Sequence, residues 1–309
     1  MRRAIACLLC ACALWPGPAE PARVYRWKDP AGGVRYGDQA PTSDAVPARE
    51  VAVVPVRAEP DRVVRLRLVE AGGGHEAWAD NQLAGTVEVR LAFARTRNAR
   101  GEPELPARAL VRPYDSALVA RIAPRDPAQS DDFALRLDAV PGDPNARPRD
   151  IEYAFPLRTP TVRVEQGYGG RYSHDDEQNR YAVDFAAPIG TPVVAARDGT
   201  VMQVENDFGS AERNAGLDRQ QLDGRANFVR IVHDDGTMAV YAHLREGGAM
   251  VRVGQRVREG QLIGYSGNTG FASGPHLHFV LQVNRGMRLV AIPFRMQGPG
   301  GILRFTETR

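Results

Sequence analysis

Apolar and polar residues alternate with a period of two in three stretches between residues 61 and 155. The stretches are Val64 to Leu68, Val87 to Phe93 and Phe133 to Leu137, and their intervening positions hold Arg, Glu or Ala. Successive side chains of a strand point to opposite faces, so this alternation predicts strands that are buried on one face. Turns rich in Pro, Gly, Asp and Asn separate the stretches, which favours an antiparallel, β-sandwich-like accessory domain over residues 61–155.

From residue 156 to residue 300 the apolar runs become short and glycine-rich turns become dense. Two segments of this region, residues 190–201 and residues 254–264, resemble each other, and each joins a strand to a tight turn that contains glycine. Glycine adopts the positive φ angles of such turns at little cost. The region is therefore predicted to form an antiparallel β-roll, which makes the whole chain all-β.

Before these regions the chain carries a small predicted module. Aromatic residues alternate on both sides of a Pro-Ala-Gly-Gly turn, which predicts a β-hairpin module over residues 23–42. The Pro- and Ala-rich stretch over residues 43–60 is interpreted as a linker.

Residues 1–19 have the pattern of a secretory signal peptide. Arg2 and Arg3 precede an apolar run from Ala4 to Trp15, and Gly17-Pro18-Ala19 provides the small residues of a cleavage site. The run is shorter than the ~20 residues that a transmembrane helix needs. The sequence thus predicts an exported protein, periplasmic or extracellular, without a transmembrane segment.

All three cysteines lie within this signal, so no disulfide is expected in the mature chain. An imperfect lipoprotein signal with an acylated Cys12 is the disfavoured alternative, because Cys10 stands where that signal has a small or branched residue. The formal net charge of +3 falls to about +1 without Arg2 and Arg3. Basic and acidic residues alternate along the chain without a basic cluster, which argues against nucleic-acid binding.

Residues with metal-binding or acid–base side chains gather in three separate parts of the predicted β-roll. They are His174, Asp184, His243, His276 and His278. His276 and His278 stand two positions apart on a predicted strand, so both point to one face. Tyr241 and His243 are expected to share a face in the same way. Asp184 stands between two apolar residues, and a carboxylate near a core needs a partner such as a metal ion.

Residues from about 160 to 295 resemble the lysostaphin-type (glycyl-glycine endopeptidase, LytM-like) family of zinc metallopeptidases. The stretches that carry the resemblance are His174 to Asp184, Val183 to Val193, Tyr241 to Leu244, Ser266 to Gly270 and Gly274 to Phe279. The resemblance implies a zinc peptidase domain over residues 156–300, with His174, Asp184 and His278 as the Zn²⁺ ligands. It also implies that His243 and His276 are catalytic residues beside the metal-bound water, and that the substrate is a peptide of bacterial peptidoglycan, either a cross-link or a stem peptide.

This ligand set suits catalysis. Three protein ligands leave one position of a catalytic zinc ion open for water. Two neutral imidazoles and one carboxylate leave the ion a net positive charge, which acidifies that water and polarises the scissile carbonyl. His243 and His276 would then be the general base and the donor to the oxyanion, in an order that the sequence leaves open.

Two features depart from the family pattern. Nine residues separate His174 from Asp184, which is more than is common in the family. Residues 175–180 are predicted to form a polar turn that brings the two ligands together, with Asp175 or Asp176 as the alternative ligand. Residues 205–224 form a polar insertion, interpreted either as a lid or as a tolerated surface loop.

Two tyrosines and two histidines outside this group of five residues also carry predictions. The resemblance implies a substrate-contacting tyrosine before the first ligand, and both Tyr168 and Tyr172 qualify. His75 is interpreted as a solvated loop residue, and His233 as a turn residue without a ligand role.

The sequence excludes one other functional class and leaves two alternatives open. A lipoyl or biotinyl carrier domain needs a lysine at a hairpin tip, but Lys28 is the only lysine and lies far from the repeat. A secreted protease for Gly-rich proteins, or a non-catalytic wall-binding regulator of another hydrolase, are the alternatives to a peptidoglycan peptidase. Whether the accessory domain inhibits the enzyme by covering its groove is left open.

Overall fold

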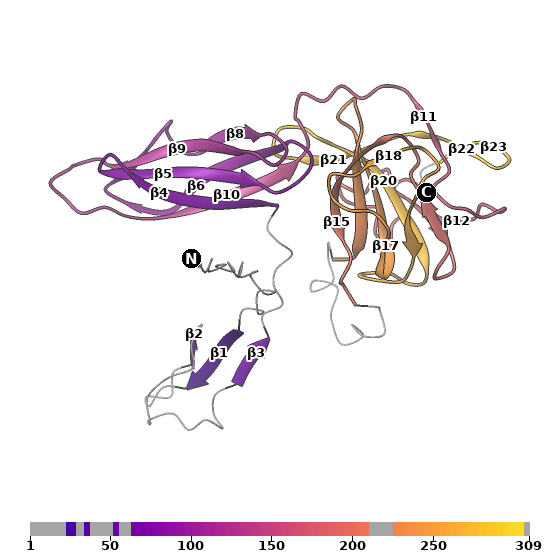
Figure 1. The fold of residues 1–309 in the computed structure, drawn as a ribbon, viewed down its shortest axis with the longest axis horizontal. Helices are drawn as coiled ribbons and strands as arrows, with labels where there is room; N and C mark the ends of the chain where they lie inside the picture. Colours follow the sequence, from indigo (N-terminus) through magenta and orange to yellow (C-terminus); the bar gives the residue numbers. More distant parts are fainter. Residues whose placement is uncertain (1–22, 29–33, 38–51, 56–62, 210–224, 306–309) are drawn as a thin grey trace, which may run out of the picture. The chain divides into compact units, whose positions relative to one another are not determined.

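The computed structural model describes residues 23–28, 34–37, 52–55, 63–209 and 225–305. All regular elements in these ranges are β-strands, which confirms the all-β prediction (Figure 1). No helix in the described part of the chain is long and apolar enough to cross a membrane. The predicted signal peptide, including Cys12, and residues 210–224 of the polar insertion lie outside the described residues. The chain divides into two units, Met1–Arg62 and Val63–Arg309.

The described residues of the first unit form one small antiparallel sheet. Its strands are β1 (Arg23–Lys28), β2 (Val34–Gly37) and β3 (Ala52–Pro55), in the order β2-β1-β3. The pairing of β1 with β2 is the hairpin arrangement that the aromatic alternation predicts. The third strand, β3, lies within the stretch interpreted from sequence as a linker.

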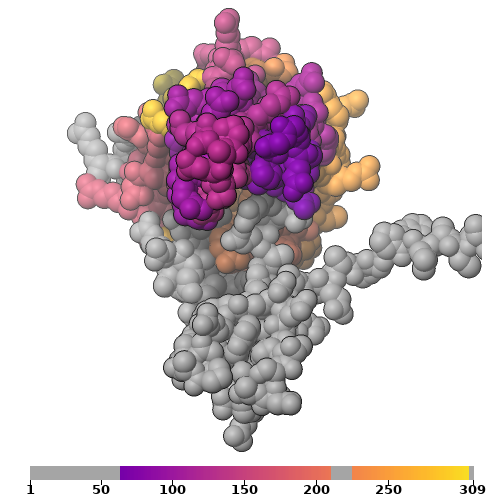
Figure 2. Space-filling view, turned by 90° about the vertical axis from the view of Figure 1, so that its left-hand side faces the viewer, coloured from indigo at the N-terminus to yellow at the C-terminus, as the bar shows by residue number. Residues whose placement is uncertain are grey.

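The second unit begins with two antiparallel sheets that form the sandwich-like region. One sheet has the order β4-β5-β9-β7, with strands β4 (Val64–Ala71), β5 (Gly74–Asn81), β9 (Ser116–Pro124) and β7 (Ala99–Glu102). The other has the order β10-β6-β8, with strands β10 (Asp132–Pro141), β6 (Val87–Arg97) and β8 (Ala107–Val111). The outer surface of this region, coloured indigo to magenta, faces the viewer in Figure 2.

The predicted alternation matches burial unevenly in these strands. Val87, Val89 and Leu91 of β6 are completely buried in the core of the sandwich. On β4, in contrast, only Val64 is buried and Leu68 is 45% exposed. The difference follows from position in the sheet, because β6 is a central strand whereas β4 lies at an edge.

The remainder of the second unit is built around one ten-stranded sheet. Its main path is β12 (Val164–Gln166), β13 (Val183–Ala186), β20 (His276–Asn284), β17 (Met238–Ala249), β16 (Asn227–Val232), β15 (Gly199–Glu205) and β18 (Arg256–Val257). Strands β14 (Pro192–Val194), β19 (Leu262–Ser266) and β21 (Leu289–Ile292) branch from this path. A separate small sheet has the order β11 (Glu152–Ala154), β22 (Arg295–Gly298) and β23 (Gly301–Leu303), in which β11 and β22 are parallel.

The two similar sequence segments pair with each other in this sheet. Strand β14 of the first segment pairs with β19 of the second, and β15 pairs with β18. The turn glycines Gly190, Gly254 and Gly260 all have positive φ angles, between 73° and 90°. These φ angles agree with the glycine-containing turns that the sequence predicts.

One face of the large sheet packs into an aromatic core. Phe185 of β13, Tyr241 of β17 and Phe279 of β20 are completely buried there. The rings of Tyr241 and Phe279 meet edge to face with centroids 5.2 Å apart, and the Tyr241 hydroxyl accepts a hydrogen bond from the backbone N–H of Ala196. Alternation along β13 and β20 then places Asp184, His276 and His278 on the opposite face.

The sandwich and the large sheet share a hydrophobic core. Met202 and Met238 belong to the large sheet, yet they pack within the buried cluster of the sandwich. Nearby, the buried carboxylate of Glu88 accepts hydrogen bonds from Asn284 Nδ2 (2.9 Å) and from the backbone N–H of Met287 (2.6 Å). Asn284 is six residues from His278 on β20, so these contacts lie ~20 Å along the strand from that histidine.

Candidate metal centre

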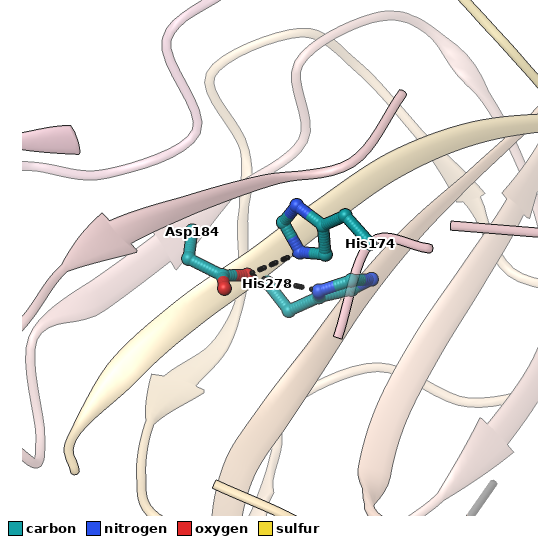
Figure 3. A group of neighbouring side chains, drawn as sticks. All are labelled: His174, Asp184 and His278. Atoms are coloured by element: carbon teal, nitrogen blue, oxygen red, sulfur yellow. Dashed lines mark hydrogen bonds and ion pairs between the residues drawn. The ribbon is translucent and has the colours of Figure 1, made fainter. Parts of the chain in front are cut away.

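Three buried side chains from two strands and a loop meet on the polar face of the large sheet (Figure 3). Asp184 on β13 and His278 on β20 are direct partners in the antiparallel ladder. Oδ1 of Asp184 lies 2.9 Å from Nδ1 of His278 and 3.2 Å from Nε2 of His174, which comes from the loop before β13. One ligand atom from each of the three residues lies within 4.8 Å of the other two.

A backbone contact fixes which tautomer a neutral His174 ring adopts. Its Nδ1 lies 2.9 Å from the carbonyl oxygen of Gly167 and donates to it, since a carbonyl oxygen only accepts. A neutral His174 ring therefore carries its lone pair on Nε2, where it can bind a metal ion, whereas a protonated ring donates from Nε2 to Asp184. Burial acts to lower the pKa of His174, but the hydrogen bond and the charge of Asp184 outweigh it and raise that pKa.

The carboxylate of Asp184 is held in its charged form. Burial acts to raise its pKa, but the hydrogen bonds from His174 and His278 outweigh burial and hold the pKa well below the usual range. A buried carboxylate that stays ionised between two imidazoles supplies a negative charge that can balance part of the charge of a divalent cation.

Two of the three separations between the ligand atoms suit a tetrahedral metal ion of the size of zinc. Bonds of ~2.0–2.1 Å from a tetrahedral ion place neighbouring ligand atoms about 3.3 Å apart. The two separations from Asp184 Oδ1, 2.9 Å and 3.2 Å, are close to this value. Two imidazole nitrogens and one carboxylate oxygen also form the ligand type of catalytic sites that keep a fourth position open.

His243 and His276 lie beside this group. Their ring centroids are 4.6 Å apart, and His243 is 5.7 Å from the ring of His278. Nε2 of His276 lies 3.7 Å from Asp184 Oδ1, and its Nδ1 donates to the carbonyl oxygen of Gly274. All five residues singled out by the sequence therefore converge on one place.

The expected shared face of Tyr241 and His243 is wrong. Tyr241 points into the aromatic core, whereas His243 reaches the metal-site face. Ala242 and Leu244 pair with successive residues of β16, so His243 is the extra residue of a β-bulge, and its φ angle is +60°. A bulge breaks the two-residue alternation and redirects a side chain, which a period-two reading cannot anticipate.

The Ser266-Gly267-Asn268-Thr269-Gly270 stretch supports this bulge. The carbonyl oxygen of Thr269 accepts a 2.6 Å hydrogen bond from Nδ1 of His243, and its Oγ1 donates to the carbonyl oxygen of Leu244. A Cβ atom on Gly267 would lie 2.3 Å from the backbone nitrogen of Arg245, so only glycine fits there. Burial, followed by the neighbouring His276 and His278, lowers the pKa of His243 to about 3 and keeps its ring neutral.

The long spacing between His174 and Asp184 is accommodated by a pinned turn. The carboxylate of Asp176 accepts hydrogen bonds from the backbone N–H groups of Gln178 and Asn179. The carbonyl oxygen of Glu177 accepts from the N–H of Ala291 on β21. Asp176 is thus exposed and engaged by the turn, and Asp175 is exposed as well, whereas Asp184 is buried between the histidines.

The two candidate tyrosines have different environments. Tyr168 is buried, and its hydroxyl donates to the carbonyl oxygen of Phe294 and accepts from the N–H of the same residue. Burial raises the pKa of Tyr168 to about 12. Tyr172 is 50% exposed, and its ring stacks on Phe271 with centroids 5.3 Å apart. Phe271, in the loop before His276, was not predicted, although an aromatic residue in a polar, Gly-rich loop is a signal for it.

The two remaining histidines lie away from the metal centre. His75 belongs to β5, and its ring meets Phe133 edge to face, so the interpretation as a solvated loop residue is wrong. His233 follows β16 at a turn, as expected, but it is buried and its Nδ1 donates to the carbonyl oxygen of Asp198.

Two known families match parts of the sequence. Residues 178–289 match Peptidase family M23, and residues 7–65 match a domain of unknown function, DUF4124. The peptidoglycan DD-endopeptidase ShyA of Vibrio cholerae is 43% identical over 100 residues, which are 32% of this chain and 19% of that protein. The glycyl-glycine endopeptidase ALE-1 of Staphylococcus capitis is 37% identical over 119 residues, which are 38% of this chain and 28% of that protein.

Solved structures are similar over parts of the chain. Lysostaphin from Staphylococcus simulans is 30% identical with a TM-score of 0.32, covering 43% of this chain and 47% of that one. A mutant catalytic domain of the M23 protein EnpA from Enterococcus faecalis is 25% identical with a TM-score of 0.34, covering 45% of this chain and 92% of that one. The matched segments span between 18% and 31% of the length of the curated relatives.

Proposed function

We propose, from the premise that residues 178–289 are a peptidase domain of family M23 of the lysostaphin type, that this protein is an exported zinc metalloendopeptidase that hydrolyses peptide bonds of bacterial peptidoglycan. One observation carries the proposal, namely the convergence of His243 and His276 on the His174–Asp184–His278 group. The relative ShyA is a peptidoglycan DD-endopeptidase, which supports the substrate class. The signal-like sequence of residues 1–19 supports export.

In this proposal, Nε2 of His174, Oδ1 of Asp184 and Nδ1 of His278 hold the zinc ion. When bound, the ion supplies a Lewis acid that acidifies water and polarises a peptide carbonyl. The ladder pairing of Asp184 with His278 fixes two of the ligands before any metal arrives. The hydrogen bond from His174 to Gly167 orients the third ligand, which is the usual role of the second ring nitrogen of a ligating histidine.

In this proposal, His243 and His276 accept and donate the proton of the attacking water. Each ring donates from Nδ1 to a backbone carbonyl, Thr269 and Gly274 respectively, so each neutral ring offers an unprotonated Nε2. The ring that accepts the proton from the attacking water becomes a cation that can donate to the oxyanion or to the leaving amine. Two neutral imidazoles side by side therefore supply both the acceptor and, after one transfer, the donor.

Tyr172 is the tyrosine proposed to contact substrate. It is half-exposed beside His174 in sequence and is braced by the ring of Phe271. Tyr168 is unsuited to this role because its hydroxyl makes two hydrogen bonds to Phe294 within the core.

Digestion of purified sacculi tests the proposal. The zinc-loaded protein, from residue 20 onward, should release peptide-linked fragments with new amino termini, which mass spectrometry identifies together with the bond cleaved. Chelation of the metal should stop the release. A zinc-loaded protein that leaves sacculi intact but cleaves elastin or oligoglycine would instead support the protease for Gly-rich proteins. Binding to sacculi without any cleavage would support the non-catalytic regulator.

A further inference from the structure

Gln166 stands in one row with two of the proposed metal ligands. It is the last residue of β12 and pairs directly with Asp184 on β13, which in turn pairs with His278 on β20. Direct partners on neighbouring strands point to the same face of a sheet. The side chain of Gln166 therefore lies on the metal-site face, on the side of Asp184 away from His278.

The two oxygens of the Asp184 carboxylate have different partners. Oδ1 faces the imidazoles of His174 and His278 (Figure 3), and Nε2 of His276 lies 3.7 Å from it. Oδ2 accepts a 3.2 Å hydrogen bond from Nε2 of Gln166. Oδ1 is thus the oxygen turned toward the other proposed ligand atoms, whereas Oδ2 is held by an amide.

Partners on both polar atoms fix the orientation of this amide. Oε1 of Gln166 accepts from the backbone N–H of Tyr172 at 3.2 Å, and Nε2 also donates to Oγ of Ser173 at 2.8 Å. A carboxylate only accepts and a backbone N–H only donates, so the amide has one orientation here. Tyr172 and Ser173 directly precede His174. Gln166 therefore joins the carboxylate ligand to the loop that carries the third ligand.

A glycine leaves the space that the Gln166 side chain occupies. A Cβ atom on Gly170 would lie 2.2 Å from Cγ and 2.5 Å from Cδ of Gln166. The carbonyl oxygen of Gly170 also accepts a hydrogen bond from the N–H of His174, so this glycine belongs to the turn that delivers the loop ligand. The placement of Gln166 is thus built into the loop itself.

The hydrogen bond to Oδ2 bears on how Asp184 can bind a cation. A carboxylate binds a cation through one oxygen or through two. Binding through both oxygens would take a coordination position that a catalytic zinc site keeps for water. Turning Oδ2 toward the ion would break its bond to Gln166, so this bond opposes the two-oxygen mode. Loss of such a partner of a ligating carboxylate typically costs about 10- to 100-fold in metal affinity or activity.

We propose that Gln166 is a positioning residue that keeps Asp184 a one-oxygen ligand and thereby leaves the fourth position of the metal site to water. The inference rests on the proposed function, because it takes the metal ligands named there. Gln166 acts through Asp184 and requires no contact with the metal ion or the substrate.

Two substitutions of Gln166 and one control provide the test. Gln166→Met removes both polar atoms at a similar length. Gln166→Glu keeps an acceptor for the N–H of Tyr172 but replaces the donor to Asp184 with a second acceptor. Gln255→Met is the matched control. Oε1 of this partly buried glutamine also accepts a 3.2 Å hydrogen bond from a backbone N–H, that of Arg252, beside β18 at the other end of the sheet path.

Two measurements report on the metal site without any peptidase assay. Competition with a chromogenic chelator gives the zinc dissociation constant of each metal-free protein. The visible spectrum of the Co²⁺-loaded proteins reports coordination number, because four-coordinate Co²⁺ absorbs more strongly than Co²⁺ with more ligands. Gln166→Met should bind zinc about 10- to 100-fold more weakly than the wild type. Its Co²⁺ bands should weaken, and Gln255→Met should match the wild type in both measurements.

Gln166→Glu separates the carboxylate contact from bracing of the loop. Only its spectrum is compared, since an added negative charge itself attracts a divalent ion. The glutamate repels Oδ2 of Asp184, so the Co²⁺ bands should weaken as in Gln166→Met. A wild-type spectrum of Gln166→Glu would mean that Gln166 acts on the loop through Tyr172, and it would overturn the inference. Unchanged zinc affinity in Gln166→Met would overturn it as well.

Urea unfolding of the metal-free proteins checks that the variants fold. Their midpoints should match that of Gln255→Met, since each loses the same kind of backbone contact. If Gln166→Met falls well below the control, the spectrum of Gln166→Glu decides between the two roles.

Digestion of sacculi by the zinc-loaded wild type separates this inference from the proposed function. Cleavage by the wild type, together with unchanged affinity and spectra in the Gln166 variants, would keep the proposed function and reject the role of Gln166. Intact sacculi, together with the expected losses in those variants, would keep the role of Gln166 and reject the proposed function. A wild type that binds neither zinc nor Co²⁺ would reject both.

Discussion

Asp184 and His278 face each other as direct partners on neighbouring antiparallel strands, with Oδ1 and Nδ1 2.9 Å apart. Both side chains are anchored by a continuous ladder that also contains the buried Phe185, Leu277 and Phe279. Two of the proposed metal ligands are therefore held by rigid sheet rather than by loops. Only His174 comes from a loop, and its hydrogen bond to Gly167 restrains it.

The first prediction concerns His278→Ala. Removing one of three proposed ligands should lower the zinc content after dialysis from about one ion per chain to near zero, and cleavage of sacculi should cease. Elemental analysis and a sacculus assay measure the two effects. Asp175→Asn is the matched control, because Asp175 is exposed and is the alternative ligand considered from sequence. Zinc loss in the control instead of in His278→Ala would reject the proposed ligand set.

The second prediction separates catalysis from metal binding. His243→Ala and His276→Ala should each retain zinc and lower kcat by about 10²- to 10⁴-fold, the usual contribution of a positioned acid or base. His75→Ala provides the control, since His75 packs against Phe133 in the sandwich. Loss of zinc from either active-site variant would show that the residue is a ligand rather than a proton carrier.

The all-β fold is predictable because it depends on local spacing, whereas the joint site of the five residues is implied by the resemblance to the lysostaphin-type family, with only part of it visible in local spacing. His276 and His278 share a face because side chains alternate along a strand with a period of two. Asp184 is recognisable in the sequence as a carboxylate between apolar neighbours. His243 is different. Its orientation depends on a β-bulge, which arises from the register between β16 and β17 and from support by Thr269.

Tertiary packing decides the features that the sequence leaves open. Tyr168 and Tyr172 are both tyrosines in one Gly-rich loop, and only tertiary contacts distinguish them, because the hydroxyl of Tyr168 bonds to Phe294 whereas the ring of Tyr172 stacks on Phe271. Met202 and Met238 lie in strands of the large sheet but complete the core of the sandwich. No periodic pattern within either region encodes a core that the two regions share.

The third prediction tests Tyr172. Tyr172→Ala should lower kcat/KM on muropeptides by about 10-fold, mainly through KM, because an exposed ring in van der Waals contact with substrate contributes about 1–2 kcal/mol. Its unfolding free energy should change little. Tyr168→Phe should behave in the opposite way and lose about 1–3 kcal/mol of stability, since it leaves backbone groups of Phe294 unpaired. Urea unfolding measures the stability of both variants, and steady-state kinetics measures their kcat/KM. A kinetic effect confined to Tyr168→Phe would contradict the assignment of Tyr172 as the substrate-contacting tyrosine.

The fourth prediction concerns the contact between the sandwich and the large sheet. Glu88→Ala should destabilise the protein by about 2–4 kcal/mol, because Asn284 and the N–H of Met287 lose a buried charged acceptor. Glu165→Ala is the control, since the ion pair of Glu165 with Arg163 is exposed and worth at most about 1 kcal/mol. The free energies of unfolding in urea give the comparison. Equal losses of unfolding free energy in the two variants would mean that the buried carboxylate stabilises the protein no more than the exposed one does.

The fifth prediction uses His233, whose burial lowers its pKa to about 4. The unfolded chain protonates this ring near pH 6.5, so between pH 6.5 and pH 4 the unfolded state binds a proton that the folded state does not. The stability due to the neutral ring is thus complete above pH 6.5 and is lost as the pH falls toward 4, by on the order of 3 kcal/mol. The groups around the ring are Tyr153, Arg197, Asp234 and Asp235.

Substitution of His233 isolates this effect, because the surrounding groups titrate in the variant as well. Urea unfolding of the metal-free wild type and of His233→Gln at pH 7.5 and pH 4.5 gives four free energies. The wild type should lose about 2–3 kcal/mol more than the variant on acidification, since the window between the two pKa values is nearly spanned. Equal losses of unfolding free energy in the wild type and the variant would mean that the buried ring is protonated in the folded protein at pH 4.5. That result would contradict the neutral ring, in which Nδ1 donates to the carbonyl oxygen of Asp198.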